Sequence, residues 1–374
     1  MSRSEGKQAS LWKQRWVAWR NSVLSNPRFQ QWAARNWFLR PFARRKAAEL
    51  FDLVAGFTYT QTLLAMVESG LLKRLAEAPT DVSEAAQVAD LSKGAAERLL
   101  RAAATLKLAQ EVSPGLWMLG ERGASLIPQE GAQAMILHHT LLYRDLADPM
   151  ALLRQNREQP TELSEFWRYA ARADADAEPS EMVAPYSELM AVSQGMVADE
   201  VLRSYRFNGV SSVLDVGGGH GAFASALAAK HQQMLIGIFD LPGVVEGARA
   251  RLDSGFEFHE GDFFCDPLPQ GYDCISLVRI LHDHDDAQAH RLLAATRAAL
   301  KPGGRLVIAE PMADTRGAKN MGDAYFGLYL WAMRSGRPRT RMELYKMLRA
   351  AGFRDFRAIK TGQPLITSLT VAFA

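Results

Sequence analysis

The segment from Val213 to Gly221, which reads Val-Leu-Asp-Val-Gly-Gly-Gly-His-Gly, constrains the fold more than any other stretch. Its apolar residues suit a buried strand and run directly into a glycine cluster. Residues 222–230 follow, with alanines and other good helix formers. A strand, a glycine turn and a helix start let the backbone approach a cofactor closely. We therefore expect a cofactor-binding turn here, with a plain structural turn as the alternative.

The spacing of the glycines and one nearby acid indicate which cofactor this turn accepts. Gly217, Gly219 and Gly221 form a Gly-x-Gly-x-Gly pattern that includes Gly218, which differs from the Gly-x-Gly-x-x-Gly of dinucleotide sites. Asp215 lies at the strand end just before them. A pyrophosphate gains nothing from that carboxylate, whereas a cofactor with an ammonium and a sulfonium group does. The pattern favours S-adenosylmethionine.

Acidic residues also end the next two predicted strands. The strand over 234–239 ends on Asp240, where a carboxylate can accept hydrogen bonds from ribose hydroxyls. The strand over 256–259 leads to Asp262, which can accept from an adenine amino group, and to Phe263, which can cover the ring. Each acid alone suits a solvated loop, but three acids at three successive strand ends indicate one site. The predicted cofactor-binding residues in these segments are Asp215, Gly217, Gly218, Gly219, Gly221, Asp240, Leu241, Asp262, Phe263 and Phe264.

Strands and helices alternate from Val210 onward, which predicts an α/β domain with a mostly parallel, seven-stranded sheet and helices on both faces. The first four strands begin near residues 213, 234, 256 and 272, and the fifth covers 305–309. A hairpin over 354–360 and 368–373 closes the sheet. Further helices are predicted over 285–300, 325–333 and 340–351.

The first half of the chain is predicted to be largely helical. Residues 45–75 suit two helices interrupted at Gly56 and Gly70, and residues 80–108 resemble a helix-turn-helix in which Ser92 caps the second helix. Residues 110–119 then suit a small β-wing. Winged helices bind DNA or serve as dimerisation modules, and we favour dimerisation because a catalytic half follows. More helices are expected over 131–154, 163–173 and 186–203, with a polar break at 174–179.

These elements predict four parts of the chain. The parts are an arm over 1–46, a helical, winged-helix-like dimerisation and substrate-lining domain over 47–185, a bridging helix over 186–205, and an S-adenosylmethionine-binding catalytic domain over 206–374.

The arm is basic and rich in tryptophan. Residues 1–46 contain 11 lysines and arginines, one acid and five tryptophans. Trp12, Trp16, Trp19 and Val23 fall on one helical face. A basic helix with a tryptophan face suits a membrane interface that holds anionic lipid. Packing on a partner subunit and RNA binding are the alternatives.

Composition and charge argue against several other classes of protein. The chain has 374 residues and a net charge of only +3, so the whole molecule is not a nucleic-acid binder by charge. Its two cysteines, Cys265 and Cys274, lack metal-ligand spacing and fit a reducing compartment. No apolar run reaches the roughly 18 residues of a membrane span, and the polar, basic start lacks a signal-peptide core. We expect a cytoplasmic protein that contacts a membrane peripherally through its arm.

The candidate catalytic residues lie just after the fourth and fifth strands. His282 and Asp283 follow the fourth strand, and Glu310 ends the fifth. Catalytic groups gather at such carboxyl ends, and a histidine oriented by a carboxylate can accept a hydroxyl proton. A metal bound by His282 and His284, or a purely structural role, are the alternatives; we predict no metal. Candidate substrate-lining residues from the preceding helices are His138, Phe166, Tyr186 and Met190.

Together these motifs resemble the small-molecule O-methyltransferase family, which includes plant caffeate and flavonoid enzymes and mammalian acetylserotonin methyltransferase. The matching segments occur in the family's order and are 215–221, Asp240, 261–264, 281–283 and 308–310. The resemblance implies a Rossmann-like methyltransferase domain behind an all-α, winged-helix-type dimerisation domain, a homodimer, and S-adenosylmethionine as methyl donor. It also implies His282 as general base with Glu310 beside it, and Arg279 as a cofactor contact.

One position departs from the family, and several segments indicate a branch. Plant members carry a second glutamate before an Arg-Thr pair, where this chain has Pro338, so orientation of His282 must rest on Glu310, Asp283 or another group. Segments 19–21, 26–35, 50–57 and 138–154 resemble the branch of purple phototrophic bacteria that methylates a tertiary hydroxyl on acyclic hydroxycarotenoids.

We therefore expect O-methylation of such a hydroxyl. The alternatives are methylation of another apolar or aromatic molecule, such as C-methylation of a bacteriochlorophyll-type tetrapyrrole or O-methylation of a phenol or polyketide. The remaining alternative functions are those of a nicotinamide oxidoreductase and a DNA-binding regulator.

Overall fold

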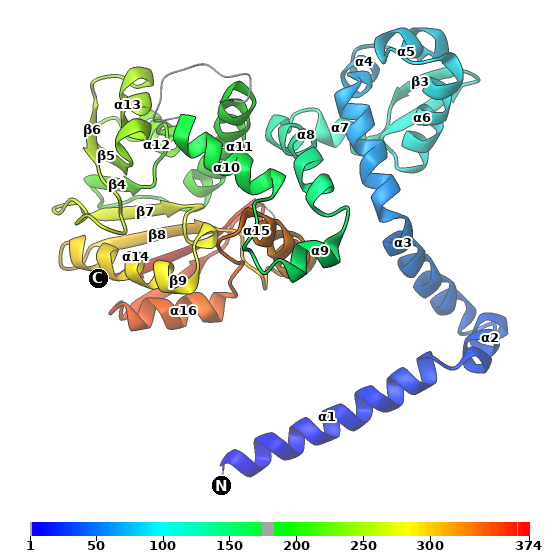
Figure 1. The fold of residues 1–374 in the computed structure, drawn as a ribbon, viewed down its shortest axis with the longest axis horizontal. Coiled ribbons are helices and arrows are strands. Elements are labelled where there is room, and N and C mark those ends of the chain that lie inside the picture. The colour runs from blue at the N-terminus through cyan, green and yellow to red at the C-terminus, as the bar shows by residue number, and fades with distance from the viewer. Residues whose placement is uncertain (1, 174–182, 365) are drawn as a thin grey trace. The chain divides into compact units, whose positions relative to one another are not determined.

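The computed structural model describes residues 2–173, 183–364 and 366–374, and their side chains apart from those of residues 2–10, 168–173 and 183–192. The chain forms two compact units, Met1–Ala124 and Ser125–Ala374 (Figure 1). The helical domain expected over 47–185 is therefore divided between the units. The residues that follow 124 group with the catalytic sheet.

The second unit is built on a seven-stranded sheet with the order β6-β5-β4-β7-β8-β10-β9. Strands β4 to β8 pair in parallel, and β10 lies antiparallel between β8 and β9. The strands are β4 Ser212–Val216, β5 Leu235–Asp240, β6 Phe256–Glu260, β7 Cys274–Val278, β8 Arg305–Glu310, β9 Asp355–Ile359 and β10 Ser368–Phe373. The predicted α/β class and the mostly parallel sheet are confirmed.

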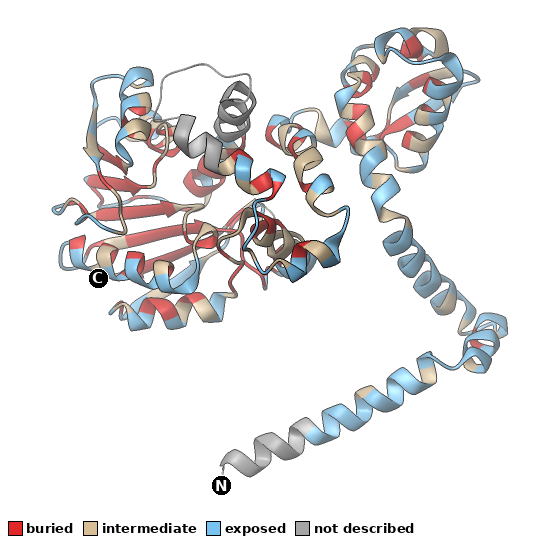
Figure 2. Ribbon diagram, in the orientation of Figure 1, coloured by how far each residue is buried: buried red, intermediate tan, exposed pale blue. Residues whose placement is uncertain are grey.

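The central strands of this sheet are largely buried (Figure 2), and apolar core clusters include residues from both of its faces. In β8, Leu306 and Ile308 join one core cluster, whereas Val307 and Ala309 join the other, because side chains alternate along a strand. Helices α14 Asp286–Ala299 and α16 Arg341–Ala350 contribute to the first cluster. Helices α11 Val183–Ser204 and α12 Ala222–Lys230 contribute to the second. Helix α13 covers Pro242–Arg251 and packs with β5 and β6.

A smaller cluster joins the helices before the sheet to a segment after β8. Helices α8 Glu130–Asp145, α9 Pro149–Arg154 and α10 Glu162–Ala173 supply Leu142, Leu152 and Leu163. These pack with Tyr329 and Leu330 of α15, Gly327–Met333. A short π-helix, η3 Gly322–Phe326, leads into α15, a feature that is frequent at functional sites.

The first unit contains the predicted helix-turn-helix and wing. Helices α5 Val82–Val88 and α6 Lys93–Thr105 form the motif, and the Ser92 hydroxyl accepts the Ala95 N–H as the predicted cap. Strands β2 Ala109–Ser113 and β3 Leu116–Leu119 form the wing, which β1, Thr80–Asp81, extends to a three-stranded sheet. The predicted wing is therefore present, as part of a small sheet in an otherwise helical unit. Helices α4 Leu71–Glu77 and α7 Glu121–Leu126 flank the motif.

The arm is helical and exposed, in helices α1 Ser2–Leu24 and α2 Pro27–Arg35. Helix α3 follows over Arg40–Glu68 and passes through Gly56 without interruption, so the predicted break there was wrong. Gly56 faces open space and a helical interior glycine costs only about 1 kcal/mol, so neighbouring helix formers carry the helix through it. The break comes at Gly70, which has a φ of +73°.

Within the described residues, one helix, α3, has the length and mean apolarity of a membrane span. The criterion is weak by itself because core helices of soluble proteins also meet it, although only 11% of this window is buried. The helix is not an unbroken apolar run, since it contains Asp52, Tyr59 and Gln61.

We expect Gly237→Ala to destabilise the second unit by about 1–3 kcal/mol, the usual cost of overpacking a core. A Cβ at Gly237 would overlap the Tyr272 hydroxyl, which crosses beneath β5 to hydrogen-bond Glu257 of β6. Thermal unfolding would measure the loss. Gly255→Ala is the control, because a Cβ there meets nothing within 4 Å. An equal effect of both changes would contradict this account.

Candidate active site

The predicted site residues gather at one edge of the sheet, because the carboxyl ends of parallel strands meet there. Strand β4 lies between β5 and β7, so the glycine turn is placed beside the loops that follow both neighbours. Gly217 has a φ of +70°, and a Cβ there would lie 2.5 Å from Ile280 and 3.7 Å from Phe263. The glycine backbone therefore packs closely between the loops after β6 and β7. A side chain at position 217 would occupy the space between these loops.

Asp215 is buried beneath this turn, at the end of β4. Its Oδ1 accepts a 2.6 Å hydrogen bond from the hydroxyl of Ser276 on β7. Burial raises the pKa of Asp215 to about 7, an effect that Ser276 opposes and the nearby charge of Asp240 increases. A buried carboxyl without a cationic partner is suited to receive a positively charged ligand group.

Asp240 ends β5 and holds the glycine turn in place. Its Oδ2 accepts the N–H of Gly219 and its Oδ1 accepts the N–H of Leu241, both at 2.8 Å. The carboxylate thus lies at the rim of the turn, where a ribose would pass in the predicted arrangement.

The loop after β6 supplies an aromatic wall to the same edge. The Asp262 carboxylate accepts the N–H of Phe264 at 2.8 Å. The rings of Phe263 and Phe264 lie 4.6 Å apart, centroid to centroid, and both approach His284, at 5.6 and 4.9 Å. His284 therefore packs in an aromatic contact, and burial lowers its pKa.

The candidate base, His282, lies in a short 3₁₀ turn, η1 Leu281–Asp283, after β7. Its Nδ1 hydrogen-bonds Oε2 of Glu310, which ends the neighbouring strand β8. The other carboxylate oxygen, Oε1, accepts the N–H groups of Ile280 and Leu281 at 2.9 and 2.7 Å. One buried carboxylate thus fixes both the backbone of the turn and the imidazole ring.

Asp283 contacts the opposite side of the ring, with its Oδ1 3.2 Å from His282 Nε2. Burial by itself lowers the pKa of His282, but the charges of Asp283 and Glu310 outweigh it, so the pKa lies above the usual value. The Asp283 side chain is 35% exposed and that of Glu310 only 4%, so Asp283 has room to move and Glu310 has none.

The segment over 335–339 holds the carbonyl groups of the same turn. The N–H of Arg337 donates to the carbonyl of His282 at 2.9 Å, and the buried Arg339 guanidinium donates to those of Leu281 and His284. Gly336 is essential to this approach, because a Cβ there would overlap the His282 carbonyl. The segment containing Pro338 therefore supports the turn through its neighbours, while Glu310 and Asp283 contact the ring.

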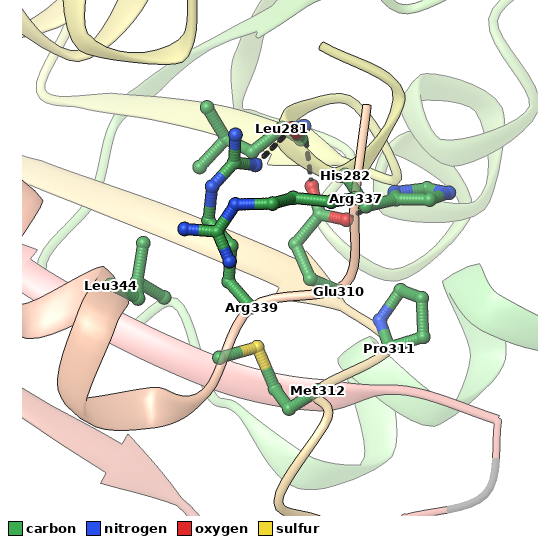
Figure 3. A pocket seen from close by; sticks show the side chains of 8 residues that line it. All are labelled: Leu281, His282, Glu310, Pro311, Met312, Arg337, Arg339 and Leu344. Carbon is green, nitrogen blue, oxygen red and sulfur yellow. Dashed lines mark hydrogen bonds and ion pairs between the residues drawn. The ribbon is translucent and has the colours of Figure 1, made fainter. Parts of the chain in front are cut away.

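A small cavity of about 10 Å³ lies beside His282 and Glu310. Figure 3 shows Glu310, Arg337 and Arg339 around it, together with Pro311 and Met312. A cavity of this size has room for about one water molecule, so it is too small for an acceptor molecule.

The remaining predicted residues have different outcomes. Arg279 follows β7 with a φ of +58°, and its charge lowers the pKa of the nearby His282. His138 and Phe166 lie together, with ring centroids 4.8 Å apart. The side chains of Tyr186 and Met190 lie outside the described residues.

Three neighbours of the site were not predicted from the sequence. They are Ser276, which bonds Asp215; Gln194 of α11, whose amide faces Gly219; and Phe326 of η3, whose ring lies 6.1 Å from that of His282. A serine inside an apolar strand was the only available signal, because the other two reach the site through tertiary packing.

Metal-ligating residues do not converge in the part of the chain that the structure describes, where no three His, Cys, Asp or Glu side chains are grouped to hold an ion. His282 and His284 face different partners, Glu310 and the Phe263–Phe264 pair.

The chain matches a known domain family and resembles characterised proteins over most of its length. Residues 143–354 match the O-methyltransferase domain. The chain is 41% identical to demethylspheroidene O-methyltransferase of Cereibacter sphaeroides, covering 94% of this chain and 93% of that protein. Identity to the protein of the same name in Rhodobacter capsulatus is 43%, covering 88% and 82%.

Solved structures of methyltransferases also resemble this chain. Human N-acetylserotonin methyltransferase, in complex with S-adenosylmethionine, has a TM-score of 0.72 at 28% identity, covering 88% of this chain and 97% of that one. A methyltransferase of calicheamicin biosynthesis, with S-adenosylhomocysteine bound, has a TM-score of 0.71 at 27% identity, covering 88% and 98%.

We expect Glu310→Gln to change the proton distribution on His282. The glutamine NH₂ would face Nδ1 as a donor, so the neutral ring would carry its proton on Nε2, and loss of the charge would lower the pKa of His282. Nitrogen-15 NMR of labelled histidine across a pH titration measures the tautomer and the pKa of His282. Glu257→Gln, near His259, is the control. An unchanged tautomer and pKa would refute the role given to Glu310.

Proposed function

The chain belongs to the S-adenosylmethionine-dependent O-methyltransferase family, and we propose that its acceptor is the tertiary hydroxyl of an acyclic hydroxycarotenoid. The observation that carries the proposal is the identity of 41–43%, over most of the chain, to two proteins named demethylspheroidene O-methyltransferase. The acceptor would then be of the hydroxyneurosporene or demethylspheroidene type.

The residues at the sheet edge fit the methyl donor. The glycine turn provides a backbone surface without side chains, whose space a Cβ would occupy. Asp215 provides a buried carboxyl for an ammonium group. Asp240 and the Asp262–Phe264 segment lie at the ends of the next two strands for the ribose and adenine. S-adenosylmethionine would supply a sulfonium methyl group, whose bond to sulfur breaks as its bond to the acceptor oxygen forms.

We propose that His282 accepts the hydroxyl proton at Nε2. The contact with Glu310 supports this role, because a proton held on Nδ1 leaves Nε2 of the neutral ring with a free lone pair. An alcohol is far less acidic than an imidazolium, so the proton moves as the new bond forms and not beforehand. Much of the rate would come from positioning of the two reactants.

The pH dependence of this base follows from its surroundings. The two carboxylates raise the pKa of His282, so its protonated, inactive form extends to higher pH than for an ordinary histidine. The rate should therefore rise with pH through that pKa. In the protonated ring the Nε2–H donates to Asp283, and loss of that proton leaves Nε2 to accept from the acceptor hydroxyl.

The direct test supplies purified protein with isotope-labelled S-adenosylmethionine and 1-hydroxyneurosporene or demethylspheroidene in liposomes. We expect a labelled methoxy carotenoid from the wild type. His282→Ala should reduce turnover about 10²–10⁴-fold, the usual range for a general base, while cofactor affinity persists.

Two results would overturn parts of this proposal. Absence of transfer to these carotenoids, despite cofactor binding, would reject the acceptor, and tetrapyrroles and phenols would be tested next. Equal losses of turnover and cofactor affinity in His282→Ala would reject the assignment of His282 as base.

Cofactor affinity should depend on pH through Asp215. Its carboxyl is half protonated near pH 7, and the ammonium group requires the charged form. Affinity should therefore fall about tenfold per pH unit below 7, with proton release on binding measurable by calorimetry in two buffers. In Ser276→Ala the midpoint should move to higher pH, because the Ser276 hydrogen bond lowers the pKa of Asp215. A flat profile would contradict this assignment.

We also propose that the protein acts at the surface of the inner or a photosynthetic membrane, held by its arm. Support comes from tryptophans that are 71% exposed at Trp12, 63% at Trp19 and 71% at Trp37, in residues 1–46, which contain 11 basic residues and one acid. Such a surface combines interfacial rings with attraction to anionic lipid. A substrate dissolved in the bilayer would be reached from this position.

Vesicle co-sedimentation tests the arm. We expect the full chain to bind vesicles with anionic lipid more tightly than neutral vesicles, and to lose binding in Trp12→Ser/Trp19→Ser. Met118→Ser is the control, as an exposed apolar side chain on the wing. Equal binding of wild type and the double variant would reject the membrane role.

We further propose that the chain is a homodimer formed through its first unit. The exposed apolar side chains in the middle of α3, which include Phe51, Leu53, Val54 and Phe57, support an interface there. A monomeric mass by light scattering in detergent-free buffer would contradict it.

A further inference from the structure

A second cluster of buried titratable groups lies beside the base and is not used in the mechanism above. Two consecutive histidines of α8 each bond a tyrosine of the segment after β8. His138 Nε2 lies 2.9 Å from the Tyr329 hydroxyl, and His139 Nε2 lies 2.7 Å from the Tyr325 hydroxyl. Both pairs join residues almost 200 positions apart in the sequence, and all four side chains belong to the second unit.

The direction of the hydrogen bonds in one pair follows from a third residue. The indole N–H of Trp167 donates to the Tyr329 hydroxyl at 3.2 Å, and an indole can only donate. The Tyr329 hydroxyl keeps its own proton to donate, and it donates to His138 in the tautomer whose Nε2 is unprotonated. Burial lowers the pKa of His138 to about 4 and also lowers that of His139, so both rings are neutral near pH 7.

The two tyrosines continue an aromatic layer that begins at the base. Phe326 meets His282 edge to face at 6.1 Å, Tyr325 lies 4.9 Å from Phe326, and Tyr329 lies 5.9 Å from Tyr325, between ring centroids. Phe166 and Trp167 of α10 extend the layer around His138, at 4.8 and 5.9 Å. Five rings, Phe166, Trp167, Tyr325, Phe326 and Tyr329, thus form one layer that we call the aromatic wall.

The histidines determine what this wall presents to a ligand. A tyrosine hydroxyl next to a hydrocarbon ligand would lose its hydrogen bonds to water, which disfavours binding unless a protein group replaces them. Here His138 and His139 satisfy both hydroxyls from α8. The rings can then cover an apolar molecule with carbon surface, and no polar group is left unpaired.

We propose that the aromatic wall binds the hydrocarbon chain next to the acceptor hydroxyl, and that His138 and His139 are positioning residues that make this wall selective for apolar acceptors. This inference rests on the proposed carotenoid acceptor, whose chain beyond the hydroxyl offers only hydrocarbon. The wall starts at His282, so a chain lying on it would place its hydroxyl-bearing end at the base.

The test compares His139→Leu, Tyr325→Phe and the double variant. His139→Leu leaves the Tyr325 hydroxyl without its partner, and we expect KM for the hydroxycarotenoid to rise about tenfold with kcat within twofold. In His139→Leu/Tyr325→Phe the unpaired hydroxyl is removed as well, and KM should return to within about threefold of the wild-type value. A generally damaged fold would not recover in this way.

Direct binding separates this proposal from the proposed function. The affinity for an acyclic polyene of the same length without a hydroxyl, followed by its visible absorption, should change in the same pattern, whether or not methyl transfer occurs. His290→Leu, on the exposed side of α14, is the control for loss of a histidine. Unchanged polyene affinity in His139→Leu, or no recovery in the double variant with cofactor binding intact, would overturn the proposal.

Discussion

The carboxylate of Glu310 is the interaction on which the candidate site depends. It accepts two backbone N–H groups of the turn after β7 with one oxygen and bonds His282 Nδ1 with the other. The parallel pairing of Val278 with Ala309 brings the ends of β7 and β8 to the same level, so Glu310 reaches the turn without an intervening loop. Because the carboxylate is buried, its removal would leave three donors without a partner.

The rest of the unit is arranged around this turn. Arg337 and Arg339 hold its carbonyl groups from the segment before α16, which the capping box of Thr340 and Glu343 fixes. Phe326 of η3 packs on the imidazole, and the histidine–tyrosine pairs connect η3 and α15 to α8. The glycine turn lies at the same edge of the sheet, where Gly217 packs against Ile280 of the turn after β7. The glycine turn, His282 and the aromatic residues of η3 and α15 therefore pack together around residues 280–283.

The sequence was sufficient for the features that local patterns encode. Strand ends with Asp215, Asp240 and Glu310 were predicted because an apolar run, a turn and an acid follow one another, and the seven-stranded sheet followed from the alternation of elements. Gly56 was misjudged because its cost in a helix is small. Ser276, Phe326 and the histidine–tyrosine pairs were not foreseen, because their partners lie about 45 to 190 positions away and no periodicity predicts such packing.

The central claim is that Glu310 holds His282 so that Nε2 receives the acceptor proton. A crystal structure of the protein with S-adenosylhomocysteine and the hydroxycarotenoid tests it most directly. The account predicts the acceptor oxygen within about 3 Å of Nε2, Asp283 displaced from the 3.2 Å contact that it makes here, and Glu310 unmoved. An acceptor oxygen placed against another group, with Asp283 still on Nε2, would contradict it.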